Sequence, residues 1–220
     1  MSEKRKKKFR FKCVRCGNCC TNKDTLVNVT FHDILRLKKN LDLNLDELLE
    51  ILGFYVFENP PSPEQIEKMV VPPIETEKGM AFVGLRKKPS GQCYFYNKEK
   101  EKCMIYGIRP MFCRTFPFSF KIIFNEQNKS KAKIKMHYTE KAKKYCKGIG
   151  DDMPKIDEEK WIKLGKTTIE NMNENNILTD KWNAKVNQNV IVPTARNYLL
   201  TIFNLEKKGP KKAQTSNSSD

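Results

Sequence analysis

The stretch FKCVRCGNCC, from Phe11 to Cys20, is the most informative part of this 220-residue chain. Four of its residues are cysteines with the spacing C-x2-C-x2-C-C: Cys13, Cys16, Cys19 and Cys20. Two residues between cysteines let one turn of the chain aim both sulfurs at a single ion, which is why this spacing recurs in zinc and iron–sulfur sites. Gly17 permits the tight turn between them. The stretch therefore predicts the first half of a thiolate metal site.

The other cysteines lie between residues 93 and 146, each beside aromatic residues or turn-forming Gly and Pro. Their settings are CYFY, CMIYGIRP, MFCRTFPF and CKGIG, which contain Cys93, Cys103, Cys113 and Cys146. Eight thiolates are enough for two four-thiolate sites, or for one cluster with spare thiols, and the sequence leaves this partition open. His32 and His137 stand apart from the cysteines, so we expect them at the surface or in the core rather than on a metal.

The composition and the lack of a signal peptide favour metal binding over structural disulfides as the use of the cysteines. With 39% hydrophobic residues, the chain can build a core without disulfide staples. The basic start MSEKRKKK is not followed by the apolar segment of a signal peptide, and the longest apolar run, LLEILGFYVF (48–57), is broken by Glu50 and Gly53. We therefore expect a cytoplasmic protein without a transmembrane segment, in which thiols stay reduced. The alternatives are structural disulfides, as in a hyperthermophile cytoplasm, and unrelated buried or nucleophilic thiols.

Basic residues outnumber acidic ones and gather at the start of the chain. The formal net charge is +16, from 42 Lys and Arg against 26 Asp and Glu. Residues 1–10 are expected to form a disordered basic arm, and Phe9 and Phe11 are interleaved with its charges. Such an arm can bind nucleic acid through phosphates, with the rings stacking on bases, or it can act as a solubilising tail. The polar residues 207–220 are expected to form a disordered tail.

Hydrophobic periodicity predicts an α+β fold. Thr30 and Asp33 form the capping pair of a helix that ends near Leu41. Further helices are expected over 45–57, from residue 62, and over 157–175, 178–186 and 193–208; strands are expected over 79–85, 93–97, 118–124 and 132–138, with the last two in a hairpin. We therefore expect a compact cysteine-bearing domain over residues 11–150 and a helical C-terminal extension over 151–206 that packs on it.

Five motifs occur in a fixed order over roughly residues 9–150: FKCVRCGNCC, VTFHDILRL, CYFY, CMIYGIRPMFCRTFPF and CKGIG. In order and kind they resemble the YkgJ-type cysteine-cluster family, described as a zinc- or iron-chelating domain and shared with flagellin lysine N-methylases. The resemblance implies that all eight cysteines are metal ligands, for a 4Fe-4S cluster or for Zn2+. Lys147 departs from the pattern, because proline is expected there, and the helical end from about Asp157 is not covered.

Two arginines accompany the cysteines, Arg109 in YGIRP and Arg114 in CRTFPF. Guanidinium groups can offset the negative charge of a thiolate cluster and donate hydrogen bonds to it. They can also bind an anionic cosubstrate beside the cluster, and the remaining alternative is that they face solvent or bind backbone carbonyls. Both are therefore candidate cofactor-binding residues. Phe116 and Phe118, on either side of a proline, are expected to cover the site and limit the access of water.

Four functions follow from these residues. The first is an iron–sulfur or zinc protein whose centre is structural or transfers electrons. The second is an enzyme such as a lysine N-methylase acting on a protein substrate, which rests on the resemblance alone, since the chain lacks a GxGxG turn and a C-x3-C-x2-C triad. The third is a basic zinc module that binds nucleic acid through its N-terminal arm. The fourth, metal storage or delivery, requires labile metal, whereas thiolate sites hold metal tightly.

Overall fold

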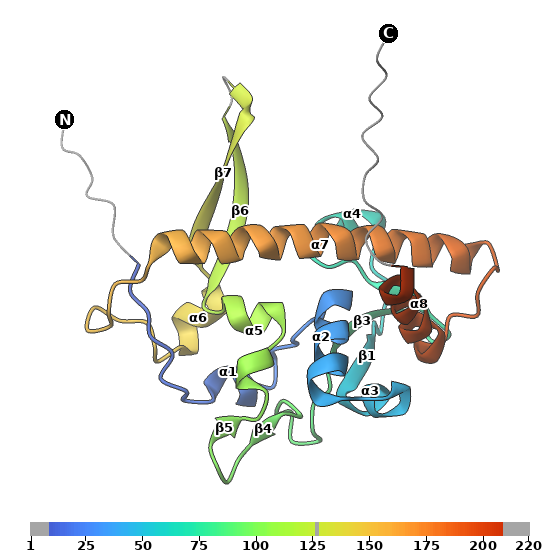
Figure 1. Ribbon diagram of the computed structural model, residues 1–220, viewed down its shortest axis with the longest axis horizontal. Helices are drawn as coiled ribbons and strands as arrows, with labels where there is room; N and C mark the ends of the chain where they lie inside the picture. Colours follow the sequence, from blue (N-terminus) through green and yellow to red (C-terminus); the bar gives the residue numbers. More distant parts are fainter. Residues whose placement is uncertain (1–8, 126–127, 209–220) are drawn as a thin grey trace.

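The computed structural model describes residues 9–125 and 128–208, and it shows the mixed α+β fold that the sequence predicts. Three expected features lie partly outside the described residues: the basic arm before Phe9, the tip of the hairpin at 126–127, and the tail from residue 209. One long helix runs along the molecule, with the cysteine-bearing loops under one half and a small sheet with its helices under the other (Figure 1). In the described ranges, no helix combines the length and apolar character needed to cross a membrane.

Several of the helices begin where the sequence supplies a side-chain cap. The Thr30 side chain accepts a hydrogen bond from the N–H of Asp33, and the Asp33 carboxylate accepts one from the N–H of Thr30, which is a reciprocal capping box. Asn44 and Ser62 cap the next two helices in the same way. The helices are α1 (Asn18–Thr21), α2 (Phe31–Leu41), α3 (Leu45–Ile51), α4 (Pro63–Glu67), α5 (Met111–Thr115), α6 (Glu140–Tyr145), α7 (Glu158–Asn187) and α8 (Ala195–Lys208), with a 3-10 turn η1 (Tyr106–Ile108).

The strands form three small antiparallel sheets. A three-stranded sheet has the order β1-β3-β2, and two further sheets are the pairs β4-β5 and β6-β7. The strands are β1 (Leu52–Val56), β2 (Ile74–Thr76), β3 (Gly79–Leu85), β4 (Tyr96–Asn97), β5 (Lys102–Cys103), β6 (Phe118–Asn125) and β7 (Asn128–Tyr138). The predicted hairpin is confirmed, and the predicted strand at 93–97 is shorter than expected.

The prediction of one helix over 45–57 is wrong in its second half. The helix ends at Ile51, and Leu52–Val56 continues as β1, which pairs with β3 so that Leu52 lies opposite Leu85 and Gly53 opposite Gly84. The segment LGFYV contains a glycine, two aromatic residues and a valine, which favour a strand over a helix. The pairing with β3, thirty residues away, is a tertiary interaction that the local periodicity did not reveal.

The hydrophobic core lies between the three-stranded sheet and helices α2, α3, α7 and α8. Trp182 of α7 is 1% exposed and packs edge-on against Tyr198 of α8, with ring centroids 5.2 Å apart. The indole N–H of Trp182 donates to the carbonyl of Glu75 at 2.9 Å. The amide of Asn183 donates to the carbonyl of Pro73 at 3.0 Å and accepts from the N–H of Glu75 at 2.8 Å, so α7 is fixed to β2 by polar as well as apolar contacts.

Helix α7 is continuous over 30 residues, whereas the sequence predicts two helices over 157–175 and 178–186. The polar run NMNENN interrupts the apolar pattern and suggested the break. Asn175 in this run is 2% exposed, and its side-chain oxygen accepts a hydrogen bond from the N–H of Phe31 at the start of α2. A buried asparagine with a specific partner therefore takes the place of an apolar residue at this contact.

The N-terminal segment packs against the base of the hairpin. Phe9 lies edge-on to Phe118 and Tyr138, with ring centroids 5.5 and 5.2 Å apart, and Phe11 lies 5.9 Å from Phe118. The N–H of Arg10 donates to the Tyr138 hydroxyl at 2.9 Å, and that hydroxyl donates to the carbonyl of Arg10 at 2.7 Å. These rings are engaged within the protein, so the idea that they stack on bases is not supported by their position.

Candidate metal centre

The cysteine-rich stretch folds as a loop that ends in one helical turn. Gly17 lies just before α1 with φ +74°, a left-handed conformation that glycine adopts without strain, and its carbonyl accepts hydrogen bonds from the N–H groups of Cys20 at 2.8 Å and Thr21 at 3.0 Å. A Cβ atom at this position would collide with the ring of Tyr96. Glycine is therefore required here both for the backbone angle and for the close approach of Tyr96.

Hydrogen bonds join this loop to two of the chain segments that carry downstream cysteines. The N–H of Cys93 donates to the carbonyl of Cys20 at 2.8 Å. On the other side, the N–H of Lys12 donates to the carbonyl of Gly148 at 3.0 Å, and the Asn18 amide donates to the carbonyl of Tyr145 at 2.8 Å. The first cysteine motif is thus held between the loops that carry Cys93 and Cys146.

All eight cysteines line a single cavity of about 730 Å³. These residues are Cys13, Cys16, Cys19, Cys20, Cys93, Cys103, Cys113 and Cys146. Each of them is a free thiol in the structure. Residues separated by up to 133 positions in the sequence therefore converge on one space, as expected for members of one or two shared sites.

The two predicted arginines lie in different environments. Arg109 lines the cavity, and its guanidinium lies 3.9 Å from the ring centroid of Tyr106, while Arg15 approaches the same ring at 4.6 Å. Arg109 also donates from Nε to the carbonyl of Tyr106 at 3.1 Å. Arg114, by contrast, is exposed and does not line the cavity. The structure thus brings Arg109, but not Arg114, to the cysteines, and it adds Arg15, which the sequence did not single out.

Cys19, Cys20 and Cys103 influence one another's ionisation near Arg109. The pKa of the Cys103 thiol is lowered to about 6 and that of the Cys19 thiol to about 7, in both cases mainly by a hydrogen bond with Cys20, and the positive charge of Arg109 acts in the same direction. The hydrogen bonds to Cys103 and Cys19 raise the pKa of the Cys20 thiol itself. Two of the eight sulfurs are therefore disposed to be thiolates near neutral pH.

The remaining buried thiols resist ionisation. Burial raises the pKa of Cys93, Cys113 and Cys146, with neighbouring cysteines adding to the effect. A bound cation favours the thiolate form, so loading of this site with metal releases protons from these groups.

The donor set fits a thiophilic metal. Soft thiolates select zinc and iron–sulfur clusters over magnesium or calcium. The sulfurs of Cys19 and Cys20 are 3.8 Å apart. This matches the separation of about 3.8 Å expected for two sulfurs on one tetrahedral ion with bonds of about 2.3 Å. Among the described residues, however, no group of three or more Cys, His, Asp or Glu side chains is already arranged to hold one ion.

The histidines lie outside the cavity lining. His32 pairs through Nε2 with the carboxylate of Glu174 at 2.6 Å. His137 lies on β7, where burial and nearby lysines lower its pKa. Phe116 and Phe118 do line the cavity, and Phe116 stacks on Tyr145 with ring centroids 5.9 Å apart.

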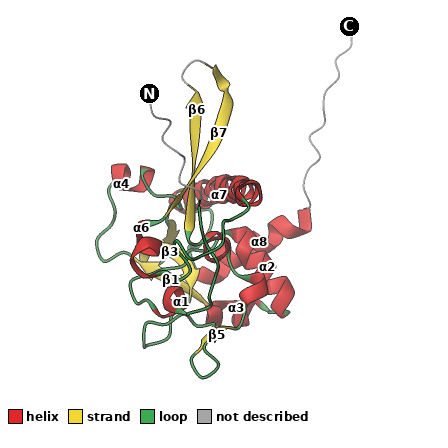
Figure 2. Cartoon of the chain, turned by 90° about the vertical axis from the view of Figure 1, so that its left-hand side faces the viewer, coloured by secondary structure: helices red, strands yellow, loops and turns green. Residues whose placement is uncertain are grey.

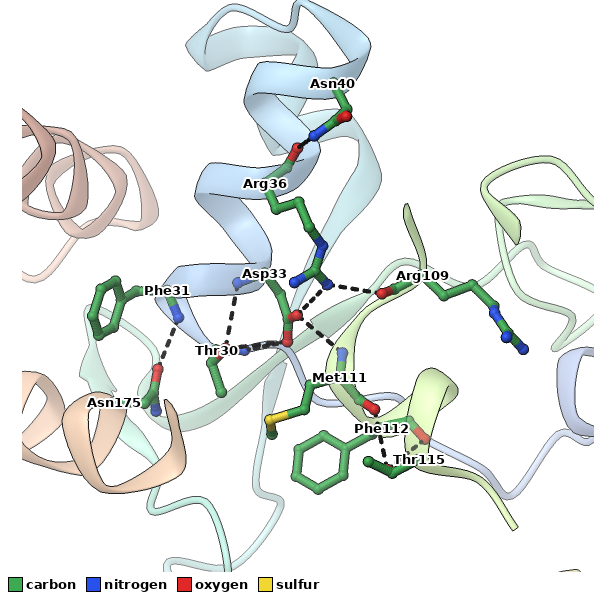
Figure 3. A network of polar contacts seen from close by, with 10 residues as sticks. All are labelled: Thr30, Phe31, Asp33, Arg36, Asn40, Arg109, Met111, Phe112, Thr115 and Asn175. Atoms are coloured by element: carbon green, nitrogen blue, oxygen red, sulfur yellow. Dashed lines mark hydrogen bonds and ion pairs between the residues drawn. The ribbon is translucent and has the colours of Figure 1, made fainter. Parts of the chain in front are cut away.

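A buried acid supports the site from α2, and the sequence analysis did not assign it this role. Asp33 is 0% exposed, and one of its carboxylate oxygens accepts a hydrogen bond from the N–H of Met111 at 2.9 Å, at the start of α5 (Figure 3). The same oxygen pairs with Arg36 at 2.6 Å, and Arg36 also donates to the carbonyl of Arg109 at 2.7 Å. The chain between Arg109 and Cys113 is thus fixed to α2 by one carboxylate and one guanidinium. The sequence signal was the Asp33–Arg36 spacing of three, which places both side chains on one helix face.

Comparison with known proteins identifies the family. Residues 12–147 match the family model CxxCxxCC, described as "Putative zinc- or iron-chelating domain". The chain is also similar to the uncharacterized protein MJ0661 of Methanocaldococcus jannaschii, with 25% identity over 149 residues, which is 68% of this chain and 63% of that protein. The chain therefore spans less than two thirds of the length of this relative. No solved structure matches. Because the family model covers more than half of the chain and describes metal chelation, this protein belongs to the CxxCxxCC family of zinc- or iron-chelating domains.

Proposed function

We propose that the protein holds an iron–sulfur cluster in the cysteine-lined cavity, with zinc as the alternative metal, and that the centre faces a second molecule instead of being a closed structural site. The observation that carries the proposal is the convergence of all eight cysteines on one cavity of about 730 Å³. When bound, an iron–sulfur cluster supplies electron transfer. The thiols of this chain would hold it, and Arg109 would offset the negative charge of the thiolates.

The shape and lining of the cavity support an accessible centre. A structural zinc site is closed around four ligands, whereas a cavity of about 730 Å³ is within the range of small-molecule sites, about 300–1,000 Å³. Its walls extend beyond the cysteines to apolar residues such as Met69, Phe82 and Met172. Apolar walls beside a metal centre exclude water and influence its reduction potential. Free thiols also require a reducing compartment, so we include the cytoplasm in the proposal.

Metal and acid-labile sulfide analysis after anaerobic purification, together with a visible absorption spectrum, tests the proposal. Brown protein with matching iron and sulfide supports it. Colourless protein with stoichiometric zinc supports metal binding but contradicts the iron–sulfur assignment. Protein without either metal, with its thiols oxidised in pairs, contradicts the proposal as a whole and favours disulfides.

The ligand assignment predicts that Cys16→Ser and Cys113→Ser each lose most of the bound metal and lower the stability of the fold, because ligand binding and folding are coupled. Cys16 belongs to the first cysteine motif and Cys113 to the downstream cysteines, so the two variants sample both groups. Ser119→Ala is a matched control, since Ser119 lines the same cavity without supplying a sulfur. Metal content equal to that of the unmodified protein in both cysteine variants would contradict the assignment.

A further inference from the structure

The hairpin β6–β7 projects from the body of the protein. Figures 1 and 2, taken at right angles, both show it extending past α7 and away from the helices. Its base is packed, because Phe118 is 2% exposed and a Cβ at Gly165 of α7 would collide with the ring of Phe120. Further along β6 the side chains are open to solvent: Ile123 is 46% and Phe124 61% exposed.

One face of this hairpin carries an excess of positive charge. Between residues 118 and 138 the sequence contains five lysines and one glutamate. In the register of the two strands, Lys121 lies opposite Lys135, Ile123 opposite Lys133, and Ser119 opposite His137, so these residues share one face. Like charges directly opposite one another destabilise a β ladder. The pairing of Lys121 with Lys135 therefore lowers the stability of the hairpin, and the packing of the fold gives no reason for it.

Nothing within the described residues neutralises this face. Lys121, Lys133 and Lys135 are exposed, and none of them forms an ion pair with an acidic side chain of the described ranges. Burial and the charges of Lys121, Lys143 and Lys135 lower the pKa of His137, which outweighs the opposite effect of Glu140. The face thus has a positive electrostatic potential, which attracts anions from outside the chain.

The cysteine cavity lies beside this face. Ser119 and Lys121 of β6 line the cavity that contains the cysteines. A polyanion bound to Lys121 is therefore next to the wall of the cavity.

We infer that the lysine face of β6–β7 binds single-stranded nucleic acid. Phosphates pair with Lys121, Lys133 and Lys135, which are spaced along a ribbon as charges are along a nucleic-acid backbone. Ile123 offers apolar contact on the lysine face itself, whereas Phe124, the next residue of β6, belongs to the other side of this narrow two-stranded ribbon. A flexible single strand, unlike a duplex, can pass over the edge of the ribbon, so that its phosphates meet the lysines while an unpaired base stacks on the exposed ring of Phe124. This inference is independent of which metal the cavity holds.

Fluorescence anisotropy of the full chain with a labelled 20-nucleotide RNA, and with the DNA of the same sequence, measures the dissociation constant over a series of salt concentrations. K121Q/K133Q/K135Q is expected to weaken binding at least tenfold and to reduce the slope of log K against log salt by about 2, from about 0.7 for each lost phosphate contact. K39Q/K181Q/K185Q removes the same charge from exposed sites on α2 and α7 and is expected to change affinity less than twofold.

Two further results separate the inference from general electrostatic attraction. Phe124→Ala is expected to weaken binding about tenfold with the salt slope unchanged, because it removes stacking and no charge. Equal weakening by the two triple variants, or no binding by the unmodified protein, overturns the inference. Binding to vesicles rich in phosphatidylserine that depends on the same three lysines, without binding to RNA or DNA, also overturns it and assigns the face to a membrane surface. No variant should melt below the parent, since these side chains are exposed and K121Q/K133Q/K135Q also removes the repulsion between Lys121 and Lys135.

Discussion

At the scale of single residues, Asp33 links helix α2 to the chain that leads into α5 and Cys113. Its carboxylate is fully buried and accepts hydrogen bonds from Thr30, Met111 and Arg36. A buried carboxylate is tolerated only when its oxygens are paired in this way. Asp33 therefore acts on the site at a distance, through the position of the chain that leads into α5 and Cys113.

Replacement of this carboxylate tests the link. Asp33→Asn is expected to lower the free energy of unfolding by about 3–5 kcal/mol, because it leaves Arg36 without its charged partner and puts an amide donor against the N–H of Met111. Urea unfolding measures the loss. Asp46→Asn is the control, since Asp46 is an exposed partner of Arg196 and should change stability by 1 kcal/mol or less. Similar losses in both variants would mean that Asp33 has no special role.

Gly17 offers a second test at this scale. Gly17→Ala forces a left-handed backbone angle on alanine and drives its Cβ into Tyr96, so we expect a loss of about 2 kcal/mol and a lower metal content. Gly107→Ala lies in the loop between Cys103 and Cys113, where a Cβ meets no atom within 4 Å, and should stay within about 0.5 kcal/mol of the parent. Equal metal content in the two purified variants would show that the Gly17 turn is not needed for the site.

At the scale of elements, the long helix α7 connects the two halves of the molecule. It contacts β2 through Trp182 and Asn183, and it contacts the hairpin through Gly165. It also reaches α2 through Asn175. At Gly165, Asn175 and Asn183 the contact residues are small or carry an amide, which lets the hairpin approach α7 closely and gives the start of α2 and the edge of the sheet specific hydrogen bonds.

The contact at Gly165 predicts that replacing this helical glycine by alanine destabilises the protein, which is the opposite of the usual effect. Glycine to alanine inside a helix normally stabilises it by up to about 1 kcal/mol. Gly165→Ala should instead destabilise the protein by about 1–3 kcal/mol, because the new Cβ overlaps the ring of Phe120. Thermal unfolding measures the effect, and Asn173→Ala at an exposed position of the same helix should be neutral or slightly stabilising. A stabilised Gly165→Ala variant would show that the hairpin does not depend on this close packing.

At the scale of the whole molecule, metal binding and folding should be one process. The cavity is lined by loops that are distant in sequence, and its thiols are held together by few direct contacts between them. Removal of the metal is therefore expected to lower the free energy of unfolding by about 3 kcal/mol or more, or roughly 6–12 °C in melting temperature for a chain of this size. Scanning calorimetry before and after chelation measures the shift.

The control for this experiment uses the Cys16→Ser/Cys113→Ser double variant. Chelation should not change its melting temperature, because it no longer holds the metal. An unchanged melting temperature in the parent protein after verified metal loss would show that the metal contributes nothing to the fold. In that case the site is preformed and the loops do not close on the ion.

The amino-acid sequence alone was enough to predict a thiolate metal site and the nature of most elements. Cysteine spacing follows from local turn geometry, and helix caps such as Thr30 with Asp33 act over three residues, so both can be recognised without a fold. The ordered motifs likewise led to the family to which the chain belongs. The assignment of individual cysteines to metal centres stays a prediction.

Only the tertiary structure decided which groups meet. Leu52–Val56 is a strand because it pairs with β3, and the polar segment around Asn175 lies inside α7, where Asn175 accepts a hydrogen bond from Phe31. Tertiary structure also places Arg109 in the cavity and Arg114 outside it. It brings Asp33 to the start of α5, and it sets Lys121 opposite Lys135 on the hairpin. These are contacts between residues far apart in sequence, and their energies depend on burial and distance, which local periodicity does not contain.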